Sequence, residues 1–310
     1  MDSRSNGPLG GRNPAKKLLR QILPVVTENL GLRPPAMPAV CTGERLDPDR
    51  WQAAPMAAYW VGQATILVRL HGVTILTDPH FHDTAGPRIA GRSTGRRRST
   101  APPLTIDELP PVDIIALSHA HMDHWEKGSL ERLARKETAV IIPHRTRALL
   151  PRGKARFGEV FEATWGEQHE IRGLRFTALQ PKHWGARWGF DWWRGYNAYA
   201  IDTAERRVLF AGDTGETRAF DDIGPVDLAI IGIGNSYEPW GRHHTSPEQA
   251  AAMAERMRAR LLAPVHHATF HDPTESREEP LERLRRVWPE ERIVCPRVGE
   301  AFYADGQCGA

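Results

Sequence analysis

Residues 117–124 read Leu117-Ser118-His119-Ala120-His121-Met122-Asp123-His124, and this stretch decides the fold. It follows the apolar segment 112–117, whose composition predicts a buried strand. Two of its histidines, His119 and His121, alternate with Ala120, so both side chains leave the same side of an extended backbone. Imidazole together with carboxylate suits zinc and related divalent ions. We therefore interpret the stretch as a metal-binding loop at a strand end, rather than as a histidine-rich surface loop.

Further apolar segments, which also read as strands, each lead to a residue that can bind metal: residues 174–179 before His183, 207–211 before Asp213, and 261–265 before His266. Glycines on both sides of Asp213 let the backbone turn sharply and bring this carboxylate close to its neighbours. The complete predicted ligand set is His119, His121, Asp123, His124, His183, Asp213 and His266. These are too many ligands for one tetrahedral ion with an open position. The sequence therefore predicts two divalent ions, assigned as Zn²⁺, with Asp213 as the bridging ligand.

The order of these motifs resembles that of the metallo-β-lactamase superfamily: HAHMDH at 119–124, a histidine after residues 180–182, AGDTG at 211–215 and a late histidine. A closer resemblance is to the branch that contains N-acylphosphatidylethanolamine-hydrolysing phospholipase D. It is carried by motifs spread over roughly residues 55 to 304, among them WVGQAT at 60–65, LTDPHF at 76–81, KHW at 182–184 and HTSPEQA at 244–250. The superfamily resemblance implies an α/β fold, the αββα four-layer sandwich, with the metals at one edge. That branch often has His where this chain has Gln63.

Composition and length agree with the expectation of a soluble enzyme. The 310 residues predict a tail over 1–50, with a short amphipathic helix near 15–30, and one hydrolase domain over 51–310. The net charge of +3 is small, and no nucleic-acid module is visible, so nucleic acid is not expected as a partner. The three cysteines form no CxxC pair, which indicates a reducing compartment. We expect a cytoplasmic protein, with peripheral contact at the inner membrane face through its basic, apolar N-terminal segment.

Two segments are expected near the mouth of the metal site. Residues 88–98 carry five arginines, which form either a solvated loop or a contact for phosphate. Residues 184–196 hold six aromatic residues between glycines; these either pack in the core, hold an acyl chain or lie at a membrane interface. The predicted substrate contacts are Gln63, Arg98, Trp184 and Trp188. His244 occupies a position that lies beside the metals in the resembled branch, where it would contact a phosphate oxygen or protonate a leaving group.

The ligand set predicts a hydrolase. Two ions would lower the pKa of a shared water to about 7 and supply a metal-bridging hydroxide, which Asp123 would orient. The catalytic residues are thus predicted to be Asp123 and His244, with no serine or cysteine nucleophile. From the resemblance we expect a phosphodiesterase of the N-acylphosphatidylethanolamine phospholipase D type, acting on a phospholipid. The alternatives are a lactonase or other carbonyl-ester hydrolase on a small soluble metabolite, and a metal-binding protein without turnover.

Overall fold

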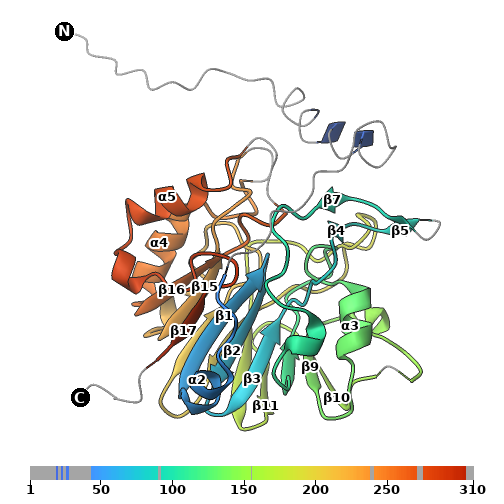
Figure 1. Cartoon of the computed structure of the whole chain (residues 1–310), viewed down its shortest axis with the longest axis horizontal. Helices are drawn as coiled ribbons and strands as arrows, with labels where there is room; N and C mark the ends of the chain where they lie inside the picture. Colours follow the sequence, from blue (N-terminus) through green and yellow to red (C-terminus); the bar gives the residue numbers. More distant parts are fainter. Residues whose placement is uncertain are drawn as a thin grey trace.

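The computed structural model describes residues 19, 22–23, 26–27, 43–89, 92–154, 156–237, 241–270 and 275–304. Two large sheets face each other, and helices cover their outer sides (Figure 1). The seven-stranded sheet has the order β10 (Glu159–Ala163), β9 (Ala139–Pro143), β8 (Ile114–Ala116), β3 (Val73–Thr77), β2 (Thr65–Leu70), β1 (Met56–Gly62) and β17 (Ala301–Tyr303). The six-stranded sheet has the order β11 (Gln168–Ile171), β12 (Leu174–Leu179), β13 (Ala198–Asp202), β14 (Arg207–Phe210), β15 (Leu228–Gly232) and β16 (Leu261–Val265).

Alternating side chains along β1 show how the layers are built. Met56, Ala58 and Trp60 face the core between the two sheets, where Trp60 belongs to the same cluster as Phe176 of β12. The intervening residues of β1 point the other way, into the core beneath the helices of this half. Because strand side chains alternate between faces, a strand that is buried throughout must have apolar layers on both sides. A third apolar cluster lies outside the six-stranded sheet, so the molecule is the four-layer sandwich that the sequence predicted.

The helices are short and lie on the outer layers. They are α2 (Pro48–Ala53), α3 (Lys127–Leu133), α4 (Pro247–Arg256) and α5 (Glu279–Arg285), with the 3-10 turns η1 (Ile106–Glu108), η2 (Arg147–Leu149), η3 (Asp221–Ile223) and η4 (Glu290–Arg292). The start of α4 follows from its sequence: the Ser246 hydroxyl accepts from the Gln249 backbone N–H, and the Gln249 side chain accepts from the Ser246 N–H. No helix in the described part of the chain is long and apolar enough to cross a bilayer.

Local departures from the sequence expectations concern element ends. From the sequence, the segments 59–70 and 73–77 are predicted to be the two strands of a hairpin that turns at residues 71–72. In the structure Gln63 adopts a positive φ of 51° and divides the first segment into the antiparallel strands β1 and β2. The sequence predicts a helix that starts after Ser246 and runs to about Arg260, and a second one over 279–288. Helices α4 and α5 end earlier, at Arg256 and Arg285. Most of the predicted helix near 15–30 lies outside the described residues; those described, 19, 22–23 and 26–27, are helical. Contacts with the domain begin before residue 51, because the Tyr59 hydroxyl donates to the carbonyl of Glu44.

The arginine-rich segment forms two small hairpins instead of an irregular loop. Strand β4 (Thr84–Ala85) pairs with β7 (Arg96–Arg97), and β5 (Arg88–Ile89) pairs with β6 (Arg92–Ser93). The first hairpin brings Arg96 and Arg98 toward the edge of the sandwich where the predicted ligands lie. Their environments differ: Arg96 in β7 lines the cavity, whereas Arg98, one residue beyond β7, is buried against the carbonyls of His80 and His82.

Candidate metal centre

The predicted ligands come from one edge of the sandwich. Strand β8 is parallel to its neighbours β3 and β9, and β14, β15 and β16 are parallel to one another. Strand β12 runs in the same direction as β14, because both pair antiparallel with β13. The carboxyl ends of β8, β12, β14 and β16 therefore bring His119, His183, Asp213 and His266 to a common place.

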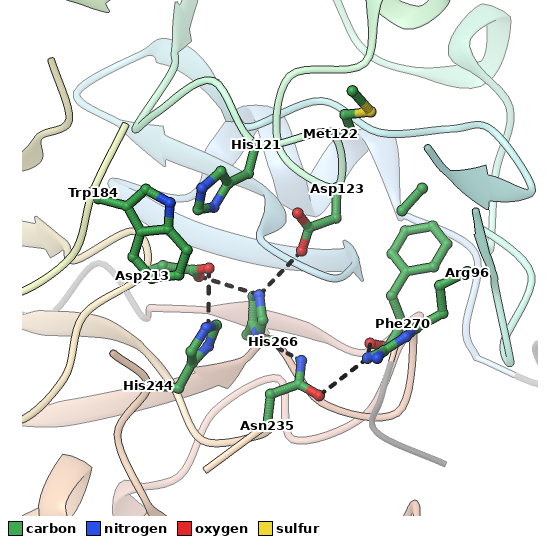
Figure 2. Close-up of a pocket in the computed structure, with 11 residues that line it drawn as sticks. Arg96, His121, Met122, Asp123, Trp184, Asp213, Asn235, His244, His266 and Phe270 are labelled. Atoms are coloured by element: carbon green, nitrogen blue, oxygen red, sulfur yellow. Dashed lines mark hydrogen bonds and ion pairs between the residues drawn. The ribbon is translucent and has the colours of Figure 1, made fainter. Parts of the chain in front are cut away.

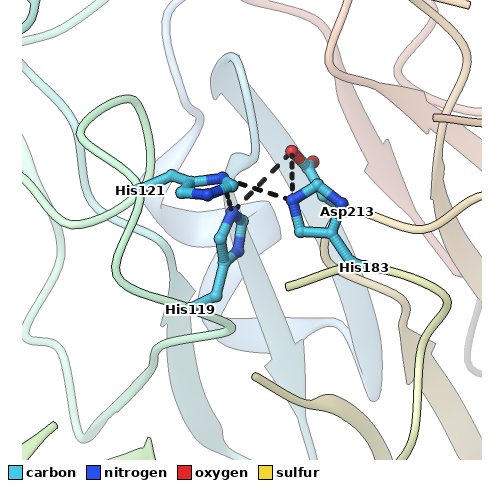
Figure 3. Close-up of side chains that lie close together, drawn as sticks. All are labelled: His119, His121, His183 and Asp213. Atoms are coloured by element: carbon cyan, nitrogen blue, oxygen red, sulfur yellow. Dashed lines mark hydrogen bonds and ion pairs between the residues drawn. The ribbon is translucent and has the colours of Figure 1, made fainter. Parts of the chain in front are cut away.

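The first ligand cluster consists of His119, His121, His183 and Asp213 (Figure 3). The Nε2 atom of His119 lies 2.8 Å from Nδ1 of His121, and Nε2 of His183 lies 3.2 Å from the same atom. Asp213 Oδ2 completes the group at 3.9 Å from His119 Nε2 and 3.8 Å from His183 Nε2. The Nε2 atoms of His119 and His183, the Nδ1 atom of His121 and a carboxylate oxygen thus converge, which is the donor set that a zinc ion takes.

The second ligand cluster consists of Asp123, His124, His266 and, again, Asp213. Asp213 Oδ2 lies 3.1 Å from His124 Nε2, while its other oxygen, Oδ1, lies 3.2 Å from His266 Nε2. Asp123 Oδ2 is 3.4 Å from both imidazole Nε2 atoms. Asp213 is the one residue common to both clusters among the described residues, which is the position that the sequence assigned to a bridging carboxylate.

Hydrogen bonds on the far side of the imidazoles fix which nitrogen faces the cluster. The Nδ1 atom of His124 lies 2.6 Å from Asp78 Oδ2, and Asp78 also accepts from the backbone N–H of Ser118 at 2.7 Å. Likewise, Nδ1 of His183 is 3.1 Å from the carbonyl of His243. A proton on Nδ1 leaves the Nε2 lone pair free to bind a cation, an arrangement common around metal-binding histidines. Asp78 holds a positive φ of 31°, so the backbone is strained where it supports the ligand loop.

The charge balance of this buried group calls for cations. Burial alone would raise the pKa values of the Asp123 and Asp213 carboxyls. The neighbouring His124 and His266 nevertheless hold both pKa values well below their ordinary range. Burial works against the imidazolium of His266, yet Asp213 and Asp123 raise its pKa to about 9, and the pKa of His124 is also raised. Protons on these two imidazoles therefore neutralise the carboxylates in the metal-free protein. Their Nε2 atoms lie 3.1 to 3.4 Å from the carboxylate oxygens without a well-aligned hydrogen bond, so the residues fit divalent cations that replace the protons.

A cavity of about 280 Å³ opens onto these ligands (Figure 2). His244, which was predicted as catalytic, lines it, with Nδ1 3.9 Å from Asp213 Oδ2. Burial lowers the pKa of His244 to about 4, so its imidazole is neutral at pH 7. Trp184, a predicted substrate contact, lines the same cavity, and its ring centroid is 4.7 Å from that of His121. The structure therefore brings both residues beside the ligand clusters.

The other predicted substrate contacts have different positions. Gln63 is fully buried; its Nε2 donates to Asp123 Oδ2 at 2.7 Å, so it contacts a ligand. Arg98 is 1% exposed, and its guanidinium donates to the backbone carbonyls of His80 and His82. Burial lowers the pKa of Arg98 to about 10. Trp188 is mostly exposed, and like Arg98 it does not line the cavity, so contact of either with substrate stays a prediction.

Two polar cavity residues were not among the predicted substrate contacts, although Arg96 belongs to the arginine-rich segment expected near the mouth of the site. Arg96 lines the cavity on the side opposite Trp184 in Figure 2 and donates to the backbone carbonyl of Phe270 at 3.1 Å. Asn235 lies between Arg96 and a ligand, with its amide nitrogen 3.4 Å from His266 Nδ1. The available sequence signal was Gly234-Asn235 directly after the apolar segment 228–233, which is typical of a turn at a strand end. In the structure Asn235 has the positive φ of 57° that asparagine tolerates in such a turn.

The model of the beta-lactamase superfamily domain matches residues 73–267, more than half of the chain. The chain belongs to the metallo-β-lactamase superfamily. A relative in Caenorhabditis elegans, N-acyl-phosphatidylethanolamine-hydrolyzing phospholipase D 1, is 30% identical over 249 residues, which cover 74% of this chain and 69% of that protein. An uncharacterized protein of Mycobacterium tuberculosis is 28% identical over 253 residues, which cover 79% of this chain and 67% of that protein. The predicted resemblance to the phospholipase branch is thus confirmed.

Solved structures agree on the fold. The isothiocyanate hydrolase from Delia radicum gut bacteria superposes with a TM-score of 0.64 at 16% identity, covering 81% of this chain and 100% of that one. Igni18, a metallo hydrolase from Ignicoccus hospitalis, gives a TM-score of 0.60 at 17% identity, covering 81% of this chain and 99% of that one. At this identity the likeness concerns the fold. With the superfamily match and the ligand clusters, the prediction of a metal-dependent hydrolase is confirmed.

Proposed function

We propose that this protein is a binuclear zinc phosphodiesterase that hydrolyses N-acylated phosphatidylethanolamine or a similar glycerophosphodiester. The observation that carries the proposal is Asp213, whose carboxylate belongs to both ligand clusters. Its Oδ2 lies 3.8 Å from His183 Nε2 in the first cluster and 3.1 Å from His124 Nε2 in the second, and its Oδ1 lies 3.2 Å from His266 Nε2. The name of the Caenorhabditis elegans relative supports the substrate class. When bound, two zinc ions would supply Lewis acidity and a water nucleophile at neutral pH.

The residues of the chain would divide the remaining work. Asp123 stands at the cavity and is held by Gln63, so its carboxylate has a fixed direction toward a water or a substrate oxygen. His244 is neutral at pH 7, which favours hydrogen-bond donation to a phosphate oxygen over protonation of the leaving group. In the reaction, water adds to phosphorus, the bond from phosphorus to the ethanolamine oxygen breaks, and that oxygen takes a proton. The products are a phosphatidic acid and an N-acylethanolamine.

Two measurements test the proposal on full-length protein. Elemental analysis of protein purified without chelator should approach two equivalents of zinc per chain. The zinc-loaded protein should then release N-acylethanolamine from N-acylphosphatidylethanolamine in detergent micelles, and should cleave bis(p-nitrophenyl) phosphate more slowly. A panel of lactones serves as the comparison. Turnover of lactones with no cleavage of either diester would replace the proposal by the carbonyl hydrolase.

A further inference from the structure

The segment after Trp184 exposes an unusual amount of aromatic surface. Trp188, Phe190, Trp192 and Trp193, here called the aromatic tip, are exposed by 51, 70, 76 and 47%. Large apolar side chains grouped on a surface indicate a binding site, whereas single exposed ones need no explanation. Core packing, the alternative for these residues, is therefore wrong for all four.

The aromatic tip is held on a built scaffold. Asp191 is almost fully buried within it; Oδ1 accepts from the backbone N–H of Trp188 at 2.8 Å, and Oδ2 accepts from Nε of Arg194 at 2.6 Å. Burial alone would raise the pKa of Asp191, but these two hydrogen bonds keep it below its ordinary value. Arg187 fastens the start of the tip to the ligand loop, because it donates to the carbonyls of Ala120 and Trp125. The scaffold thus fixes which side chains face solvent.

Its chemistry suits a medium of low dielectric constant. Asp191 is the single acid between residues 186 and 196, and its pairing with Arg194 removes the net charge of both. The backbone N–H of Trp188 already donates to Asp191 inside the loop. Insertion of the tip into a lipid interface would therefore not leave this donor without a hydrogen bond. Among the described residues, none accepts a hydrogen bond from the indole N–H of Trp188, Trp192 or Trp193. Indole rings with a free N–H are favoured at the boundary between lipid and water.

The tip also lies next to the cavity. Its chain continues from the ligand His183 and from Trp184, which lines the cavity and packs against His121. Arg187, at the start of the tip, donates to the carbonyls of Ala120 and Trp125, so the start of the tip is held against the ligand loop. We propose that the aromatic tip docks the protein on a lipid bilayer and so brings glycerophosphodiester headgroups to the cavity, an inference that rests on the proposed function for its substrate.

Vesicle sedimentation of the full-length, zinc-loaded protein tests the docking directly. The vesicles contain no substrate: one set is phosphatidylcholine, the other equal parts of phosphatidylcholine and phosphatidylglycerol. We expect partition onto both sets within about threefold, because the contact is apolar and the four side chains of the aromatic tip are uncharged. Binding that occurs on the anionic vesicles alone would assign the contact to a basic region and overturn the proposal.

Two variants locate the contact. Phe190→Ser combined with Trp192→Ser should lower the partition coefficient about tenfold or more, because two buried aromatic side chains are lost from the interface. The matched control is Val287→Ser, which removes an exposed apolar side chain about a hundred residues away in sequence from the tip. It should change partition by less than about twofold. Turnover of bis(p-nitrophenyl) phosphate should stay the same in both. Equal partition of the tip variant and the unaltered protein would overturn the proposal.

A third variant separates the tip from the N-terminal segment. Leu23 and Val26 are exposed on the helical residues there and belong to the predicted amphipathic helix. If the double variant Leu23→Ser, Val26→Ser lost vesicle binding while the tip variant kept it, the contact would lie on the N-terminal segment and our proposal would be refuted. Failure of the proposed function gives a different pattern: the tip variant then loses vesicle binding as expected, while the unaltered protein releases no N-acylethanolamine from micelles.

Discussion

His183 and Trp192 lie on the same segment of the chain in opposite environments. His183 is buried among three further ligands, and its Nδ1 is fixed by the carbonyl of His243. Trp192 is among the most exposed large apolar residues of the described chain. Both positions cost free energy in isolation, since a buried imidazole is desolvated and an exposed indole orders water. A binding partner offsets the cost in each case: cations for the ligand clusters and, in our proposal, lipid for the aromatic tip.

The two regions share one structural device, a buried carboxylate that orders the chain around it. Asp78 supports the ligand loop through Ser118 and His124, and Asp191 supports the tip through Trp188 and Arg194. The difference lies in how the carboxylate is compensated. The charge of Asp191 is balanced by Arg194, so the scaffold of the tip needs no bound cation. The charges of Asp123 and Asp213 are balanced by protonated His124 and His266, so the metal centre needs either these protons or metal ions.

The largest expected effect comes from the shared ligand. Asp213→Asn removes a charge from both clusters, and we expect zinc content below one equivalent and diester turnover at least about a thousandfold lower. The tip should be unaffected, so vesicle partition should remain within about twofold of the unaltered protein. Asp202→Asn is the control, because Asp202 pairs with Arg207 at the far end of β13. Retention of two zinc ions in Asp213→Asn would contradict the bridging assignment.

The four layers were expected from the resemblance to the superfamily, whereas strand-end reasoning on the residues themselves was sufficient for the convergence of the ligands. Buried strands and their carboxyl ends are properties of local sequence, and Asp213 between two glycines was visible as a turn. The fates of Arg96 and Arg98 were not predictable, because they depend on which face of the β4–β7 hairpin covers the sheet edge. The break at Gln63 escaped prediction as well. It rests on a positive φ and on long-range bonds, among them Gln63 N–H to the hydroxyl of Thr269 at 2.9 Å.

A second prediction concerns competition between protons and metal. The pKa of His266 is about 9 in the metal-free protein, so at pH 7 its imidazolium must lose a proton before Nε2 can bind an ion. A raised pKa means that this proton is held until the pH passes the raised value. Apparent zinc affinity should therefore increase with pH, by about tenfold per unit for each proton displaced, between pH 6 and 9.

Calorimetric titration of the chelator-treated protein in two buffers of different ionisation enthalpy measures the protons released. We expect release on zinc binding at pH 7 and less release above pH 9. Vesicle partition of the same metal-free protein should not vary over this range, since Asp191 is the single acid of the tip and its pKa is lowered. Zinc affinity that is constant from pH 6 to 9 would show that His266 is already neutral.

The smallest effect is expected at Gln63, where the buried centre meets the cavity. Its Nε2 donates to Asp123 at 2.7 Å, and its Oε1 lies 3.4 Å from the backbone N–H of Phe270. Gln63 is thus a positioning residue: Gln63→Ala should lower kcat of the diester about tenfold with KM nearly constant, because one hydrogen bond to a charged group is lost.

Gln63→Glu keeps the shape of the side chain but places a second carboxylate opposite Asp123. One proton must then be shared, and the new carboxyl pKa is raised by its like-charged neighbour. The donor is present only below that raised pKa, so the activity of Gln63→Glu relative to the unaltered protein should increase as the pH falls from 8 to 6. A ratio that is constant with pH would mean that Gln63 only fills space. A purely packing role leaves the pH profile unchanged, whereas a donor to Asp123 must shift it.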